Sequence, residues 1–409
     1  MPIHELIERL FRAESGKIRA TLIRTLRDFD AAEEVVQEAF EAALVQWPSE
    51  GIPDHPAAWL TRIAKNRAID RVRRSVDFEQ KRSAEALMIV GHVEPEEERA
   101  IEDDVLRLIF TCCHPALAPE AQVALTLQTV CGLRTEAIAR AFLVPHVTMS
   151  QRLVRAKKKI REAGIPYDVP PASLMRERLE SVSRVVYLVF TEGYASTDGD
   201  QLVQADLCDE ALRLSSLLRA HVKNEPELDG LHALMLLHDA RRATRIDADG
   251  ALVLLEDQDR TLWDWRKIVE GCRLVHAAIH DSRAGVYVLQ ATIAALHAAA
   301  PVAAMTDWQQ IERLYATLIE MAPSPIVALN HAVAVAMSQG PEKGLEQIDR
   351  ISQTGALEQY HLMHAARADL LRRLQRNHEA RTAYERALSL AAHPTERLFL
   401  ERRLNELKP

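Results

Sequence analysis

TEAIARAFLVPHVTMSQRLVRAKKKIR, residues 135–161, predicts two helices joined by a tight turn. In the second helix a narrow apolar stripe recurs at helical spacing and consists of Met149, Leu153, Ala156 and Ile160. The opposite side is polar and basic, and no acidic residue occurs between His146 and Arg161. A helix-turn-helix with such a face could enter the major groove of duplex DNA. The alternative is an amphipathic surface helix with a solvated basic side.

A second basic helix is predicted upstream, AAWLTRIAKNRAIDRVRR at residues 57–74, with Pro56 suited to the first helical position. Its polar side forms two adjacent stripes, made of Arg67, Arg71 and Arg74 and of Arg62, Asn66 and Arg73. Its apolar side consists of Leu60, Ala64, Ala68 and Val72, extended by Trp59 and Ile63. We expect this helix to lie between a packed core and an anionic partner, and a solvated basic face is the alternative.

The helix before it has the opposite polarity. Asp30 and Glu33 have the spacing of a capping box, which predicts Asp30 as the N-cap of a helix that starts at Ala31. This helix displays Glu33, Glu34, Glu38 and Glu41 beside the apolar residues Val35, Val36, Ala39 and Phe40. The break PSEGIPDHP, residues 48–56, is expected to end it after Trp47.

The whole composition is that of a globular protein. The chain has 409 residues, 48% hydrophobic and 27% charged, which predicts two or three domains. Its formal net charge of -8 argues against a protein that coats DNA by bulk electrostatics, so any nucleic-acid contact must be local. No apolar run approaches the roughly 20 residues needed to cross a bilayer, and the N-terminus is charged. We expect a cytoplasmic protein without a membrane partner.

The reactive side chains give no sign of an enzyme. The five cysteines form no CxxC pair, and the 16 histidines form no HExxH motif. The run Cys112-Cys113-His114 lacks a second ligand pair at zinc spacing, so no metal is expected. Neither GxGxxG nor GxxxxGK occurs, and no cofactor is predicted.

Helical periodicity throughout predicts an all-α fold. The expected parts are an N-terminal module at 1–74, an acidic linker at 75–102, a module at 103–164 and a tetratricopeptide-like helical-repeat domain at 173–409. A helix start is expected at Pro119 in the second module. The repeat prediction depends on small and aromatic residues in the final helix pair, which are Ala368, Ala380, Tyr384 and Ala387. Such a domain would present a concave surface to a protein partner, and an irregular helical bundle is the alternative.

These segments resemble the extracytoplasmic-function (ECF) class of bacterial sigma factors. DAAEEVVQEAFEAALVQW (30–47), followed by AWLTRIAKNRAIDRVRR (58–74), resembles their region 2, and the helix-turn-helix ending at Ile160 resembles their region 4. The C-terminal part resembles the group with a tetratricopeptide-like extension, in VYLVFTEGYAS (186–196), LLHDARRA (236–243), LLEDQDRTLWD (254–264) and SPIVALNHAVAVA (324–336).

The resemblance implies three sets of site residues. The acidic helix would dock on the clamp helices of the largest subunit of core RNA polymerase through Asp30, Glu33, Glu34, Gln37, Glu38 and Phe40. The minus-ten promoter element would be read and opened by Trp59, Arg62, Asn66, Arg67, Asp70, Arg71, Arg73 and Arg74. The minus-thirty-five element would be contacted by Thr148, Ser150, Gln151, Arg152, Arg155, Lys158 and Lys159. The second-largest subunit would contribute its flap as a further contact.

The sequence therefore predicts a non-catalytic sigma factor whose C-terminal domain regulates it. A stand-alone helix-turn-helix regulator with a ligand- or protein-sensing repeat domain is the alternative, and it would bind DNA without polymerase, as a dimer over two half-sites. A third hypothesis is a scaffold whose function lies in the repeat surface alone.

Overall fold

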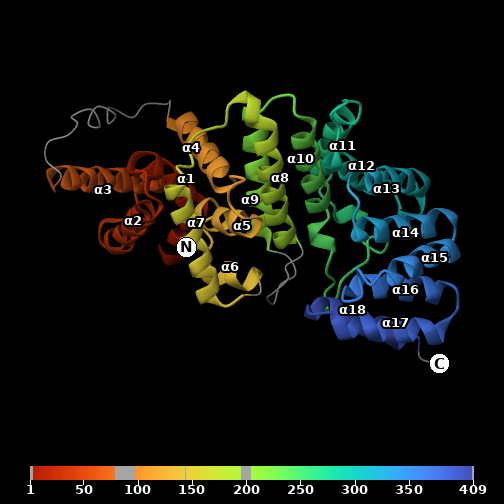
Figure 1. Ribbon diagram of the computed structural model, residues 1–409. Coiled ribbons are helices and arrows are strands. Elements are labelled where there is room, and N and C mark those ends of the chain that lie inside the picture. Colours follow the sequence, from red (N-terminus) through yellow and green to blue (C-terminus); the bar gives the residue numbers. More distant parts are fainter. Residues whose placement is uncertain (1–2, 79–96, 143, 195–203, 408–409) are drawn as a thin grey trace. The chain divides into compact units, whose positions relative to one another are not determined.

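The computed structural model describes residues 3–78, 97–142, 144–194 and 204–407. The prediction of an all-α fold is confirmed: regular structure in these ranges is helical, apart from an isolated antiparallel bridge between Ile246 and Leu252 (Figure 1). The chain divides into two compact units, Met1–Val189 and Phe190–Pro409. None of the helices in the described ranges is long and apolar enough to cross a membrane.

The first unit contains three N-terminal helices followed by a second helical group. Its helices are α1 (Ile3–Leu26), α2 (Phe29–Glu50), α3 (Pro56–Phe78), α4 (Glu97–Cys112), α5 (Pro119–Thr129), α6 (Thr135–Ala141), α7 (His146–Glu162) and most of α8 (Ala172–Tyr194). The helix starts predicted at Pro56 and Pro119 are confirmed. Residues 79–96 of the expected linker, and Leu143 in the expected turn, lie outside the described residues.

The predicted start of the acidic helix was wrong. Asp28, not Asp30, is the N-cap of α2, and its carboxylate accepts hydrogen bonds from the backbone N–H groups of Asp30 and Ala31 at 2.8 and 3.0 Å. Arg27 ends α1 in a left-handed conformation, with φ of 55°, and this brings Asp28 into the capping position. Asp30 therefore lies in the first turn of α2, where an acidic side chain is also favourable.

The predicted end of this helix was wrong as well, because α2 continues through Pro48 to Glu50. Pro48 has no N–H group for the carbonyl oxygen of Leu44, four residues earlier. Both residues are exposed, so water can hydrate that carbonyl group. The helix ends at Gly51, which has a φ of 89°.

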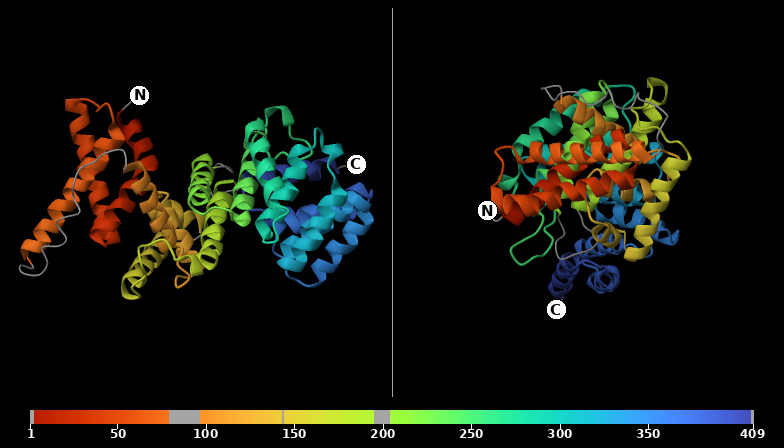
Figure 2. Two further views of the ribbon diagram at one scale, coloured as in Figure 1. Left: turned by 90° about the horizontal axis from the view of Figure 1, so that it is seen from above. Right: turned by 90° about the vertical axis from the view of Figure 1, so that its left-hand side faces the viewer.

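The N-terminal group has a core formed by α1, α2 and α3 (Figure 2). Leu60, Ala64 and Ala68 of α3 are buried, as their spacing predicted, whereas Val72 is half-buried. The half-buried ring of Trp59 lies edge-on to the buried Trp47, with 5.5 Å between the ring centroids.

The second helical group packs directly against α1. Gly16 of α1 lies so close to the carbonyl oxygen of Val130, just after α5, that a Cβ atom would clash with it. The buried Arg19 donates from Nη1 to the carbonyl oxygens of Thr129 and Gln128 at 2.6 and 3.2 Å, capping the C-terminal end of α5. The hydroxyl of Tyr167 lies 2.7 Å from the carbonyl oxygen of Ala20 in α1. These contacts make one compact body of the two groups.

The second unit is a succession of helices in which each packs on its neighbours in sequence (Figures 1 and 2). Its α-helices are α9 (Ala205–His221), α10 (Pro226–Asp239), α11 (Trp265–Ala278), α12 (Val286–Ala299), α13 (Trp308–Met321), α14 (Pro325–Gln339), α15 (Pro341–Gln353), α16 (His361–Arg373), α17 (Asn377–Leu390) and α18 (Pro394–Glu406). Short 3-10 helices occur at η2 (Arg242–Thr244), η3 (Arg260–Leu262) and η4 (Ala303–Met305).

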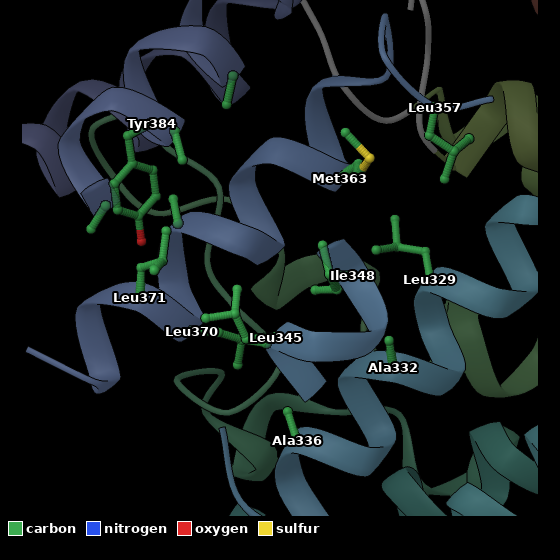
Figure 3. Close-up of a cluster of buried hydrophobic side chains, with 14 of the residues drawn as sticks. Leu329, Ala332, Ala336, Leu345, Ile348, Leu357, Met363, Leu370, Leu371 and Tyr384 are labelled. Carbon is green, nitrogen blue, oxygen red and sulfur yellow. The ribbon is translucent and has the colours of Figure 1, made fainter. Parts of the chain in front are cut away.

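A continuous apolar core runs through the last five helices. Figure 3 shows Ala332 of α14, Ile348 of α15, Met363 of α16 and Tyr384 of α17 in one cluster. The predicted packing residues of the final helix pair, Ala368, Ala380, Tyr384 and Ala387, are all buried in it. Gly344 lets α15 approach α14 closely, since a Cβ atom there would lie 2.8 Å from the carbonyl oxygen of Ala332.

Candidate nucleic-acid interface

The helix α7 has one buried and one exposed face. Its predicted stripe, Met149, Leu153, Ala156 and Ile160, is buried. The opposite face exposes Thr148, Gln151, Arg155, Lys158 and Lys159, whereas Ser150 and Arg152 are half-buried. In the described part of the chain no carboxylate forms an ion pair with Arg155 or Lys159, and Lys158 has only the exposed Glu162 at 3.5 Å. This face therefore keeps its positive charge available to an anion.

Neighbouring side chains hold the first turns of α7. His146 Nε2 lies 3.3 Å from a carboxylate oxygen of Glu136 in α6 and 3.5 Å from the hydroxyl of Ser150. The guanidinium of Arg152 lies over the Phe142 ring, 5.7 Å from its centroid. A cleft of about 320 Å³ separates the start of α5 from α7 and is lined in part by Arg155. The basic side chains thus project from a fixed helix beside an open groove.

The polar residues of α3 fall into two groups. Arg62, Asn66, Asp70 and Arg73 are exposed. Arg67 Nη1 lies 3.1 Å from Glu38 Oε2 of α2, and Arg71 lies 3.0 Å from Glu38 Oε1 and 2.8 Å from Glu34 Oε2. The hydrogen bond that Arg71 donates to Glu34 is the main cause of a raised pKa for Arg71. The side chain of Arg74 lies outside the described residues. The structure thus joins part of the predicted minus-ten set to the acidic helix.

The acidic face of α2 also contacts α7. Lys157 Nζ lies 3.0 Å from Asp30 Oδ1 and 3.1 Å from Glu33 Oε2, and its side chain is only 11% exposed. Arg161 lies 3.8 Å from Asp28. Lys157 was absent from the predicted site residues, although its position four residues after Leu153 places it beside the buried stripe. This spacing could have predicted that Lys157 faces a neighbouring helix, whereas Lys158 and Lys159 face solvent.

The remaining members of the predicted polymerase-binding set differ in exposure. Gln37 is exposed, as is Glu34, whose side chain is 62% accessible. Phe40 is only 5% exposed and lies edge-on to Phe11 at 5.0 Å. Its side chain belongs to the core of the first unit, and of the predicted set only the carboxylates and Gln37 reach the surface of α2.

The adjacent thiols of Cys112 and Cys113 are buried beside hydroxyl groups. Cys112 Sγ lies 3.2 Å from Thr129 Oγ1, and Cys113 Sγ lies 3.6 Å from Thr126 Oγ1. Burial raises the pKa of both thiols, that of Cys113 to about 12. Among the described residues, no group of three side chains could hold a metal ion.

Three family models match successive segments of the chain. The model described as Sigma-70 region 2 matches residues 10–76, and Sigma-70, region 4 matches residues 107–160. A family of unknown function, DUF6596, matches residues 178–279. The region 2 match includes α2 and most of α3, and the region 4 match includes α7 up to Ile160.

Two curated relatives are similar to the chain. The chain is 44% identical to an uncharacterized protein of Rhizobium meliloti (strain 1021) over 391 residues, which cover 94% of this chain and 92% of that one. It is 27% identical over 211 residues to the probable ECF RNA polymerase sigma factor SigI of Mycobacterium tuberculosis, which cover 50% of this chain and 68% of that one. No solved structure matches the chain.

Two helical modules in this order, each with a basic helix, define a sigma factor of the sigma-70 family. Within that family, the chain fits the ECF group with a DUF6596 C-terminal domain.

Proposed function

We propose that this protein binds core RNA polymerase and directs it to a specific promoter, where transcription starts. The observation that carries the proposal is the exposed basic face of α7 in region 4. It follows a separate basic helix, α3, in region 2. Two cationic helices in one chain suit a protein that contacts two separated promoter elements.

In this proposal α7 reads the minus-thirty-five element. Thr148, Ser150, Gln151 and Arg155 would face base edges, and Arg152, Lys158 and Lys159 would contact phosphates. The lack of an acidic partner at Arg155 and Lys159 among the described residues supports this assignment, because no internal ion pair must break first.

The helix α3 would contact the minus-ten element. Its exposed residues Arg62, Asn66 and Arg73 suit phosphates and an unstacked base. Arg67 and Arg71 already have carboxylate partners on α2, so we assign them the additional task of fixing α3 against α2. Trp59, Asp70 and Arg74 complete the proposed set.

The acidic surface of α2 would bind the clamp helices of the largest polymerase subunit, through Asp30, Glu33, Glu34, Gln37 and Glu38. The pairing of Asp30 and Glu33 with Lys157 has a direct consequence for this step. Since the same carboxylates cannot keep both sets of partners, core binding would displace Lys157 from α2. The flap of the second-largest subunit is a further proposed contact of the region 4 module.

The C-terminal domain would regulate the two sigma modules and bind a protein partner. Its test is a truncation that removes residues 204–409. The cut should follow α8, because Arg178 of α8 is buried in the first unit and donates to the carbonyl oxygen of Phe110. A truncated protein with unchanged promoter output, in cells and in vitro, would refute the regulatory role.

The central experiment is a pull-down of core polymerase with the full chain, followed by mapping of transcript starts. We expect a stable complex and discrete starts at one class of promoter. The Arg155→Ala variant should lose them, while Arg273→Ala, an exposed arginine of α11 with a side chain 61% exposed, should not. A gel shift of duplex DNA without core, with no core complex, would favour the stand-alone regulator instead.

A further inference from the structure

Residues of three segments that are far apart in the sequence meet in the second unit: Tyr194 at the end of α8, LLHDARRA (236–243) and LLEDQDRTLWD (254–264). Tyr194 comes from the first segment, and its ring lies 5.4 Å from that of His238 in the second. Trp263 of the third segment lines a cavity of about 30 Å³ together with His238 and Arg241. His297 of α12 completes its polar lining.

Hydrogen bonds fix the walls of this cavity. Trp263 Nε1 donates to Thr244 Oγ1 at 3.0 Å, and Thr244 Oγ1 lies 3.2 Å from Gln258 Oε1. The guanidinium of Arg260 donates to the carbonyl oxygens of His297 and Ala300 at 2.6 and 2.7 Å. The cavity is therefore formed before any ligand arrives, which lowers the entropic cost of binding.

One arginine, Arg241, lines the cavity, and two more, Arg245 and Arg260, contact residues beside it. Arg245 lies over the Tyr194 ring, 3.8 Å from its centroid, and donates to the carbonyl oxygen of Tyr194. Arg241 Nη2 has His238 Nδ1 at 3.3 Å. In the described ranges no carboxylate forms an ion pair with Arg241, Arg245 or Arg260. By contrast, the adjacent Arg242 pairs with carboxylates at 3.2 and 3.3 Å.

The electrostatic effects converge on Arg241. Burial lowers the pKa of Arg245 and Arg260, and the charge of Arg241 lowers both further. Burial also lowers the pKa of His297 to about 4, and Arg241 adds to this shift. The pKa of His238 is lowered well below its ordinary value, first by burial and then by Arg241 and Arg245. Both imidazoles are thus neutral at pH 7.

Two further observations show unmet interactions in the cluster. The hydroxyl of Tyr194 is buried without a hydrogen-bond partner among the described residues, which is costly for a polar group. Glu396 attracts Arg245 through its charge, but its carboxylate contacts His361 Nε2, at 3.3 Å, and forms no ion pair with Arg245. The three arginines are half-buried, and positive charge that is partly withdrawn from water without a contacting carboxylate is a feature of anion sites.

We propose that this cavity binds the oxyanion group of a small molecule, a carboxylate or a phosphate, with Arg241 as its main partner. The guanidinium fork would donate to the oxyanion, and Arg245 and Arg260 would contribute their field. The cavity has room for roughly one or two oxygen atoms of the oxyanion, so the rest of the ligand would lie outside it. The inference concerns the second unit and holds whether or not the chain initiates transcription.

The test is isothermal titration and thermal unfolding of the full chain with inorganic phosphate and, separately, acetate, against sodium chloride at equal ionic strength. Wild-type protein should bind one of the two oxyanions, with a rise in Tm beyond that in chloride. Arg241→Gln should weaken binding about 10- to 100-fold. It should also raise the Tm without anion, because it removes the charge that repels Arg245 and Arg260.

Arg273→Gln is the matched control, since its charge is exposed and paired with Glu270 at 2.7 Å. It should keep the wild-type response. Should Arg241→Gln fail to fold, Arg241→Lys, which keeps the charge but loses the fork, should bind more weakly than wild type. Equal responses to chloride and to both oxyanions, or undiminished binding by the Arg241 variants, would overturn the proposal.

Discussion

Replacing Lys157 with alanine is expected to raise the affinity of the protein for core RNA polymerase about fivefold. Lys157 is 11% exposed and pairs with Asp30 and Glu33, whose side chains are 61% and 24% exposed. Since solvent screens both pairs, we take about 0.5 kcal/mol for each, or roughly 1 kcal/mol together. If α2 must release Lys157 before it binds core, wild-type protein has to break these two ion pairs first. The Lys157→Ala variant has no such pairs to break.

The same change should destabilise the free protein by a similar amount, about 1 kcal/mol. Two measurements therefore check the reasoning: the Kd for core polymerase without DNA, and the free energy of unfolding of the first unit in urea. The matched control is Lys158→Ala, because Lys158 is exposed and lies near only Glu162. It should change neither quantity.

The combination of results is decisive. A Lys157→Ala variant that is destabilised but binds core no better than wild type would show that the acidic surface of α2 is not the core-binding surface. Unchanged stability would show that the two ion pairs contribute nothing in solution. Both effects of Lys157→Ala, the higher affinity for core and the lower stability, should become smaller in high salt, because the ion pairs are partly exposed.

Three further predictions concern DNA binding, pH and packing. Arg155→Ala should weaken promoter use by about 1–3 kcal/mol in a run-off transcription assay, whereas Arg273→Ala should not; equal losses would contradict the assignment of α7. Burial lowers the pKa of His232 to about 4, below its ordinary 6.5, so the unfolded chain takes up this proton first as pH falls. His232 should not change stability above that ordinary value, and as pH falls toward the folded pKa it should lower stability by about 1.4 kcal/mol per pH unit, in addition to the contributions of His238 and His297. His232→Gln should flatten this slope in urea titrations, and an unchanged slope would exclude His232 as its source. Gly344→Ala should destabilise the second unit by about 1–3 kcal/mol, measured by urea unfolding, because the new methyl group meets Ala336; a neutral effect would mean that α15 can move away.

The sequence predicted elements in which one periodic pattern decides the structure. The buried stripe of α7 could be predicted because apolar residues such as Met149 and Leu153 recur at helical spacing. This pattern lies within one helix and does not depend on other parts of the chain. The start of α2 could not be decided in this way. Asp28 and Asp30 are both competent caps, and the left-handed Arg27 at the end of α1 selects Asp28.

Tertiary partners explain the other differences. The resemblance implied a polymerase contact for Phe40, but this residue lies on the apolar side of α2, four residues after Val36, and Phe11 of α1 covers it. Lys157 is separated in function from Lys158 and Lys159 by its contact with α2, more than a hundred residues away. The cavity at Arg241 is formed by residues from several separate segments, and no local pattern relates them.

The cysteines have a practical consequence. Cys112, Cys113, Cys131 and Cys208 are buried, and Cys272 alone is half-exposed. A thiol whose pKa is raised by burial stays protonated and reacts slowly with peroxide or alkylating reagents. Burial raises the pKa of Cys272 as well, but its thiol is the accessible one, so under native conditions iodoacetamide should form its first adduct at Cys272. Later adducts at Cys112 and Cys113 would report the opening of the α4–α5 pair, and no cysteine would have to be introduced for this purpose.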